Sequence, residues 1–233
     1  MQIHGYSQLT LLDFPGRIGC TIFTGSCNLR CPFCHNSSLV LHPDCQPALD
    51  EAKILAHIES RKTKLEGVCV TGGEPTLQHD LPRFLTDLRQ TGLLIKLDTN
   101  GTNPAMLELI LKDRLVDFVA MDIKAMPSNY AHATGMKVFD MDKIFQSVDL
   151  ITNGNIDYEF RTTVVDGIHT ADDFTGIGKW LRGAKAYYLQ QYKDSGDLIA
   201  PAGLDAPSPE TLQQYREILL PYIPNTFIRG TQS

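Results

Sequence analysis

Short apolar segments alternate with segments of helical periodicity along almost the whole chain. Apolar runs bounded by turn-forming residues predict strands at residues 17–24, 67–71, 93–98, 118–123, 158–165 and 186–191, followed by a β-prone run at 226–229. Apolar side chains at helical spacing predict helices at residues 49–61, 80–90, 104–112, 142–150, 171–181 and 209–219. Strands that alternate with helices of this length are typical of βαβ units around a parallel sheet.

This sheet has to fit into 233 residues, which contain no internal repeat and no long linker. Right-handed crossovers curl such a sheet into a full or partial α/β barrel, or leave it doubly wound. Six βα units fit into this length, whereas a complete eightfold barrel typically needs about 250 residues. We therefore expect an α/β fold of the incomplete (β/α)6 TIM-like barrel class, formed by a single domain over residues 1–233.

Polar groups that are unusual for a core follow the predicted strands, end them or, in one case, lie within the strand. They are TGGEP at 71–75, DTNG at 98–101, MDIK at 121–124, RTT at 161–163 and QQ at 190–191. In α/β barrels and open parallel sheets, sites form at the carboxyl ends of the strands. We expect these five groups to face one mouth, together with three cysteines that follow the first predicted strand.

Composition and charge exclude several classes of function. The 21 basic residues are outnumbered by 27 acidic ones, and the formal charge of -6 gives no reason to expect binding to nucleic acid or to a membrane surface. No stretch reaches the roughly 18 apolar residues of a membrane span. The first residues lack the basic and apolar regions of a secretory signal, so we expect a cytoplasmic protein whose six cysteines are thiols.

Three of these cysteines, Cys27, Cys31 and Cys34, lie within eight residues. This spacing is improbable by chance in a chain with so few cysteines. Three thiolates on a tight loop can bind three irons of a cubane cluster and leave one iron without a protein ligand. An open metal position is a feature of catalytic sites, whereas structural sites are closed.

Three alternative roles for the cysteine pattern stay open at this point. The segment CPFCH fits a covalent haem attachment motif, which requires export. The segment CPFC also resembles a thioredoxin-type redox pair, in which Cys27 would be superfluous. A zinc site could use His35 as a fourth ligand, although adjacent Cys34 and His35 are awkward ligands for one tetrahedral ion. Cys45 lies in a Pro-flanked loop and is not expected to be a cluster ligand.

The motifs GSCNLRCPFCHN, TGGEP, DTNG and MDIK together resemble the radical S-adenosylmethionine (SAM) superfamily. More narrowly, the chain is similar to the glycyl-radical-enzyme activases, and most of all to the activating proteins of anaerobic ribonucleoside-triphosphate reductase. The resemblance runs from LLDFPG at residues 11–16 to YLQQY at residues 188–192. It implies an incomplete barrel of the radical SAM type, with Cys27, Cys31 and Cys34 as ligands of a 4Fe–4S cluster.

The resemblance also implies that the fourth iron is chelated by SAM. In that arrangement Phe33 packs on the adenine, and Gly72, Gly73 and Glu74 accept hydrogen bonds from the methionine ammonium. Either Lys124 or Arg161 neutralises the methionine carboxylate, unless these cations only form salt bridges to Asp122 or Glu159. The remaining candidates for cofactor contacts implied by the resemblance are Asp98, Thr99, Asp122 and Gln191.

Asp98 and Asp122 have two further interpretations. The resemblance implies that they contact the SAM ribose or hold a monovalent cation beside the SAM carboxylate, a task that suits hard oxygen ligands. Alternatively, they cap the helices that follow their strands. The resemblance thus implies a monovalent cation near Asp98 and Asp122, and the capping role stays open beside it.

The partner implied by the resemblance is a large glycyl radical enzyme, most of all an anaerobic ribonucleotide reductase. A one-electron donor such as flavodoxin or ferredoxin is a second implied partner. Two other enzyme functions are alternatives to activation of the reductase. The first is a pyruvate formate-lyase-type activating enzyme, and the second is a small-molecule radical SAM enzyme, such as a 7-carboxy-7-deazaguanine synthase-like protein. A third alternative, a non-catalytic metal or electron-transfer protein, would leave the GGEP, DTNG and MDIK motifs unexplained.

Overall fold

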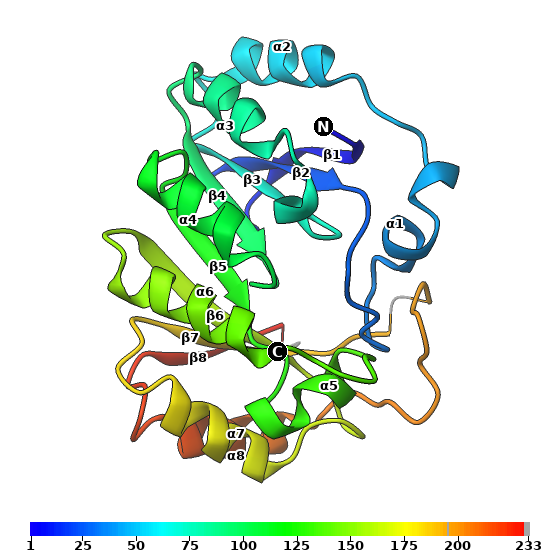
Figure 1. The fold of residues 1–233 in the computed structure, drawn as a ribbon, viewed down its shortest axis with the longest axis vertical. Helices are drawn as coiled ribbons and strands as arrows, with labels where there is room; N and C mark the ends of the chain where they lie inside the picture. Colours follow the sequence, from blue (N-terminus) through cyan, green and yellow to red (C-terminus); the bar gives the residue numbers. More distant parts are fainter. Residues whose placement is uncertain (195, 231–233) are drawn as a thin grey trace. The chain divides into compact units, whose positions relative to one another are not determined.

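The computed structural model describes residues 1–194 and 196–230 (Figure 1). Its strands are β1 (Ile3–Thr10), β2 (Gly19–Thr24), β3 (Gly67–Gly72), β4 (Leu94–Thr99), β5 (Phe118–Asp122), β6 (Asp157–Val164), β7 (Tyr187–Gln191) and β8 (Thr226–Arg229). The helices are α1 (Ser37–Leu41), α2 (Glu51–Arg61), α3 (Leu81–Arg89), α4 (Pro104–Lys112), α5 (Tyr130–Ala133), α6 (Met141–Asn153), α7 (Ala171–Trp180) and α8 (Pro209–Leu219), with short 3-10 helices η1 (Pro43–Cys45), η2 (Pro75–Leu77) and η3 (Pro127–Asn129).

The strands follow one another in chain order, with β1 and β8 as the two end strands of an eight-stranded sheet. β2 pairs with β3, β3 with β4, β6 with β7 and β7 with β8 in parallel, whereas β1 pairs with β2 in the antiparallel direction. The sheet is therefore open, mostly parallel and of the α/β class, which confirms the predicted fold class. The antiparallel β1 was not predicted, because the segment IHGYSQLT is largely half-buried and carries neither a continuous apolar run nor a strict alternation.

The chain consists of two compact units. The first comprises residues 1–28, 38–120 and 143–157, and the second comprises residues 29–37, 121–142 and the described residues from 158 onward. The prediction of a single domain over residues 1–233 stays a prediction, and each unit is described by itself below. No helix in the described ranges is long and apolar enough to cross a membrane.

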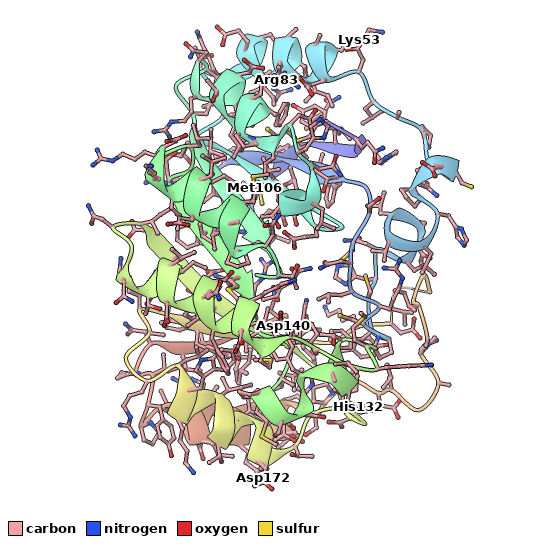
Figure 2. All side chains as sticks on the ribbon, viewed as in Figure 1. Lys53, Arg83, Met106, His132, Asp140 and Asp172 are labelled. Atoms are coloured by element: carbon pink, nitrogen blue, oxygen red, sulfur yellow. The ribbon has the colours of Figure 1, made fainter. Side chains whose placement is uncertain are left out.

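The first unit is built around the apolar strands β2, β3 and β4. The apolar stripe that predicted α3 is fully buried, and its residues are Leu81, Phe84, Leu85 and Leu88. The polar face of the same region is exposed, as Lys53 on α2 and Arg83 on α3 illustrate (Figure 2). Local signals fix the helix starts, because the Asp50 carboxylate accepts hydrogen bonds from two backbone N–H groups of α2 and Asn103 caps α4.

In the second unit, helices α7 and α8 pack side by side next to β7 and β8 (Figure 1). The rings of Phe174 and Tyr215 stack between them with centroids 4.4 Å apart. Helix α7 starts with a capping box formed by Thr170 and Asp173. The Arg229 guanidinium binds both oxygens of buried Glu159, at 2.7 and 2.8 Å, and lies over the Tyr188 ring. These contacts fix β8 at the end of the sheet.

Candidate active site

In the first unit, the cysteine loop starts directly after β2 in an unusual backbone conformation. Ser26 has a φ of 67°, in the left-handed region that few residues other than glycine adopt. Its N–H donates to the Leu39 carbonyl over 2.9 Å, and its own carbonyl accepts from the Glu74 N–H over 2.8 Å. These hydrogen bonds hold the backbone of residue 26, and with it the position from which Cys27 starts.

The two glycines of TGGEP are required by close packing against this loop. A Cβ on Gly73 would lie 1.9 Å from the Ser26 carbonyl oxygen, and a Cβ on Gly72 would lie 2.2 Å from the Thr24 nitrogen. Gly72 also has a φ of 123°, which L side chains rarely adopt. The sequence predicts that these glycines allow close approach to a ligand. The structure shows that they also allow close approach to residues 24–26.

The carboxylate of Glu74 connects TGGEP to DTNG inside the first unit. The side chain is 1% exposed. Oxygen Oε1 accepts hydrogen bonds from the Thr76 N–H, the Thr76 hydroxyl and the Thr99 hydroxyl, at 3.1, 2.5 and 2.8 Å. Oxygen Oε2 accepts from the Asn100 N–H at 2.6 Å. Burial raises the pKa of Glu74 above its ordinary value, although these hydrogen bonds oppose the shift.

Asn100, from the same DTNG motif, contacts the first cysteine. Its amide nitrogen lies 3.6 Å from the Cys27 sulfur and donates to the Asn28 side-chain oxygen over 3.1 Å. The Asn28 amide in turn donates to the Thr102 hydroxyl over 2.9 Å. The first unit therefore brings together Cys27, both glycines, Glu74, Thr99 and Asn100. The contact of Asn100 with a cysteine was not predicted.

Asp98 has a partner that sequence reasoning missed. The ammonium of Lys96, two residues earlier on β4, forms an ion pair with the Asp98 carboxylate. Lys96 is 1% exposed, and its nitrogen lies 3.8 Å from the Cys69 sulfur on β3. The signal available in the sequence was a lone lysine in an apolar strand, two residues before an acid.

In the second unit, Cys31 and Cys34 lie on one turn of the loop. The Cys34 N–H donates to the Cys31 carbonyl over 3.0 Å. Burial raises the pKa of the Cys31 thiol to about 11, although the positive charge of Lys124 opposes the shift. A cysteine that ligates a metal has to be a thiolate, so Cys31 would have to lose its proton to act as a ligand.

The cations predicted for the methionine carboxylate share one acid in this unit. The Lys124 ammonium lies 2.9 Å from one oxygen of Asp122, and the Arg161 guanidinium pairs with the other. Burial disfavours the charged carboxylate, but Arg161 and Lys124 outweigh it and hold the pKa of Asp122 well below its ordinary value. The sequence left open whether Lys124 and Arg161 form salt bridges to Asp122 or to Glu159. Both pair with Asp122, and Glu159 pairs with Arg229.

His169 is a residue of this unit that sequence reasoning did not single out. Its Nδ1 accepts from the Val165 N–H over 3.1 Å, and its Nε2 lies 2.7 Å from the Lys124 carbonyl oxygen. Because a carbonyl only accepts, the proton of the ring sits on Nε2. Burial lowers the pKa of His169, so the neutral ring is favoured. Its ring centroid lies 6.3 Å from that of buried Phe33, so His169 contacts both the cysteine loop and the MDIK segment.

The remaining candidates of the second unit have simpler surroundings. The Gln191 amide donates to the Pro207 carbonyl over 2.9 Å, and His35 is exposed. The cysteine loop is further held by the Ala200 N–H, which donates to the Pro32 carbonyl over 3.0 Å, and by a hydrogen bond from Ser37 to Asp197. No role beyond these contacts is visible for Gln191.

The donor set of the triplet suits an iron–sulfur cluster in its chemistry. None of the three cysteines forms a disulfide, and Cys20 and Cys69 are buried in strands β2 and β3. Within residues 1–194 and 196–230, however, no three His, Cys, Asp or Glu side chains form a group that could hold a metal ion. The assignment of Cys27, Cys31 and Cys34 as ligands therefore stays a prediction from their type and spacing.

Comparison with known proteins identifies the class. Residues 21–181 match the model of the radical SAM superfamily. The chain belongs to this superfamily and is an enzyme, and the family implies a 4Fe–4S cluster and SAM as cofactors. Solved structures agree in fold: Streptococcus suis SuiB bound to its precursor peptide superposes with a TM-score of 0.71 over 91% of this chain at 12% identity. Escherichia coli coproporphyrinogen III oxidase does so with a TM-score of 0.58 over 91% of this chain at 14% identity. This chain covers 48% and 53% of the length of these two proteins.

Two sequence relatives narrow the class further. A Methanocaldococcus jannaschii protein, provisionally named a glycyl-radical enzyme activating enzyme, is 30% identical over 97% of this chain and 95% of its own length. The pyruvate formate-lyase-activating enzyme of Clostridium pasteurianum is 30% identical over 84% of this chain and 83% of its own length. The chain is thus similar along most of its length to activating enzymes of glycyl radical enzymes.

Proposed function

We propose that this enzyme is an activase that generates a glycyl radical on a partner enzyme. The first candidate for this partner is an anaerobic ribonucleoside-triphosphate reductase. The observation that carries the proposal is the similarity to a named activating enzyme over 97% of this chain, together with the three cysteines within eight residues. The choice of reductase depends on the LLDFPG and YLQQY segments of the sequence. The cytoplasmic location and a flavodoxin or ferredoxin as electron donor belong to the same proposal.

In this proposal Cys27, Cys31 and Cys34 hold the cluster through their thiolates. When bound, the cluster and SAM would supply the one-electron radical chemistry of the reaction. The protein has to bind and orient these groups and exclude water from them. Asn100 supports the first of the three cysteines, because its amide contacts the Cys27 sulfur in the first unit.

The polar residues of each unit have separate tasks. In the first unit, the Gly72 and Gly73 carbonyls and Glu74 Oε2 accept hydrogen bonds from the ammonium of SAM. In the second unit, Lys124 and Arg161, the two cations that pair with Asp122, would also attract the carboxylate of SAM. Phe33 and Gln191 contribute to the adenine site, and Asp98 and Thr99 to the ribose side.

A pyruvate formate-lyase-type activating enzyme is the second candidate, and the similarity to the Clostridium pasteurianum enzyme favours it. A small-molecule radical SAM enzyme, for example one like 7-carboxy-7-deazaguanine synthase, is a third candidate. The first two differ only in the partner protein, whereas the third needs none.

The cluster is tested first. Anaerobic reconstitution is expected to give about four irons per chain, and Cys31→Ala is expected to lose them. Cys45→Ala is the matched control, because Cys45 is an exposed cysteine outside the triplet and its loss should leave the iron content unchanged. One zinc ion per chain in place of iron would contradict the proposal.

The partner is tested next with the reduced enzyme and SAM. Mixing it in parallel with an anaerobic ribonucleotide reductase and with a pyruvate formate-lyase should give a glycyl doublet in the electron paramagnetic resonance spectrum of the reductase. A doublet on the lyase alone would select the second candidate. Turnover of a small molecule without any partner protein would select the third.

A further inference from the structure

One histidine of the second unit contacts two residues to which the proposed function gives different parts of SAM. His169 lies between β6 and α7, and its side chain is 4% exposed. Its Nε2 donates to the Lys124 carbonyl over 2.7 Å, and its ring meets the Phe33 ring edge-on, with centroids 6.3 Å apart. Phe33 belongs to the cysteine loop and Lys124 to MDIK, so a single ring connects two segments that are far apart in the sequence.

The turn that carries His169 fixes the direction of its ring. The His169 N–H donates to the Val165 carbonyl over 3.0 Å, and the Val165 N–H donates back to His169 Nδ1 over 3.1 Å. Gly167, with a φ of 94°, lets the chain turn between them. The next residue, Thr170, caps α7. Backbone and ring are therefore held together, and Nε2 remains as the donor toward Lys124.

Lys124 is held at both of its ends. It lies two residues beyond the end of β5, outside the strand, so its carbonyl is not part of the regular ladder of the sheet. The donor on His169 fixes this carbonyl, while the ammonium lies 2.9 Å from an oxygen of Asp122. A shift of about 1 Å in a group that positions a substrate can cost on the order of 100-fold in rate. A side chain that fixes the Lys124 backbone therefore affects where its charge lies.

Phe33 is positioned by the same ring. Its side chain is 4% exposed, and its plane makes an angle of 62° with that of the imidazole. Edge-to-face pairs at this separation are favourable. The imidazole also packs against Phe174 of α7, with centroids 5.9 Å apart. Phe33 is thus held by a ring that is itself packed on a helix.

We propose that His169 is a positioning residue of the SAM site, and that its one ring fixes Phe33 on the adenine side and the Lys124 ammonium on the carboxylate side. This inference rests on the proposed function, because that proposal assigns Phe33 and Lys124 to SAM. His169 acts through these two side chains and not through its own contact with SAM. Different parts of the imidazole make the two contacts, so substitutions can remove them one at a time.

The test uses the full chain after anaerobic reconstitution, with variants compared at equal iron content. Equilibrium dialysis measures the dissociation constants of SAM and of decarboxylated SAM, which keeps the adenine and lacks the carboxylate. The ratio of the two constants reports recognition of the carboxylate. A general loss of folded protein would weaken both ligands alike and leave this ratio unchanged. Wild-type protein is expected to prefer SAM.

Two substitutions of His169 should separate its two contacts. His169→Phe keeps an aromatic ring beside Phe33 and removes the donor to Lys124, so it should reduce the preference for SAM by about tenfold. His169→Gln provides an N–H donor for Lys124 and lacks the ring, so it should keep the preference and weaken both ligands by about fivefold. His57→Phe is the matched control, because His57 combines a hydrogen bond to Tyr6 with an edge-on ring contact, and it should change neither constant.

A double-mutant cycle tests the contact with Phe33 separately. Phe33→Leu should weaken the binding of both ligands. His169→Gln should weaken them less in the Phe33→Leu background than in the wild type, because either substitution alone already removes the ring pair. This cycle keeps the proposal falsifiable if His169→Phe does not fold.

Three results would overturn the proposal. They are a wild-type preference for SAM in His169→Phe, an equal loss of that preference in His169→Phe and His169→Gln, and additive effects in the cycle. A wild-type chain that binds no SAM would refute the proposed function together with this inference. Absence of a glycyl radical on any partner would count against the proposed function alone.

Discussion

Substitution of Gly73 by alanine tests whether TGGEP holds the start of the cysteine loop. The added Cβ would lie 1.9 Å from the Ser26 carbonyl oxygen, whereas real Cβ atoms essentially never approach within 3.0 Å. The two segments would have to move apart by about 1.1 Å. Because the contact is with backbone, no side-chain rotation can relieve it.

The magnitude follows from the contacts that such a shift breaks. Overpacking of this kind costs about 1–3 kcal/mol. The shift also weakens two backbone hydrogen bonds, from Gly73 N–H to Thr24 and from Glu74 N–H to Ser26, each worth about 1 kcal/mol. We expect Gly73→Ala to lower the free energy of unfolding by about 4 kcal/mol, a large fraction of the roughly 5–15 kcal/mol of a typical domain.

Urea denaturation of the full chain, followed by circular dichroism, measures this loss. Gly92→Ala is the control, because nothing lies within 4 Å of its added Cβ and only its φ of 76° is strained, at about 1–2 kcal/mol. Gly73→Ala should cost clearly more than Gly92→Ala and should also reduce the iron that reconstitution incorporates. Equal or smaller destabilisation by Gly73→Ala would refute the reasoning that backbone contact with Ser26 requires this glycine.

The remaining predictions concern charged and polar residues. Asp122→Asn removes the carboxylate that pairs with Lys124 and Arg161 and should lower the free energy of unfolding by about 1–3 kcal/mol. Glu59→Gln, at an exposed ion pair, is the control and should lower it by about 0–1 kcal/mol. Equal effects of the two substitutions in urea denaturation would contradict the stabilising role of the Asp122 ion pairs. His169→Phe removes two hydrogen bonds and should cost about 1–3 kcal/mol, with His169→Gln closer to wild type. Because the folded-state pKa of His169 lies below the unfolded value of 6.5, its unfolded form binds more protons, so stability falls as pH drops below about 6.5. His169→Phe should make this decline of the free energy of unfolding shallower in urea denaturation between about pH 6.5 and 5. An unchanged dependence on pH would show that His169 does not contribute to it.

The sequence was sufficient for most of the helices and strands, because each of these carries its own signal, whereas β1 and the short helices α1 and α5 were not predicted. The ranges 104–112, 209–219 and 226–229 are those of α4, α8 and β8, since Pro at the first helical turn and a Ser or Asn cap mark where the two helices begin. β1 lacked such a signal, because its half-buried residues mix apolar and polar types without a clear period. Its pairing with β2 depends on tertiary contact and could not be predicted from local pattern.

The candidate site was predictable as motifs but not as contacts. Residue type and spacing identified TGGEP and DTNG, yet the hydrogen bonds from Thr99 and Asn100 to Glu74 depend on how neighbouring strands place their ends. His169 lies between a strand and a helix in a segment without period, and its contact with Lys124 arises only on folding. Side-chain partners across elements therefore require the structure, even where the functional positions are evident.

Glu74 illustrates why an assignment by residue type is incomplete. As a lone carboxylate beside two glycines, it is predicted to accept from a ligand ammonium. In the structure, Oε1 already accepts three hydrogen bonds, whereas among the described residues Oε2 accepts one. Only Oε2 retains the capacity for a further donor. A buried carboxylate with these donors also fixes Thr76, Thr99 and Asn100, so the residue that would contact the ligand is the one that holds the two motifs together.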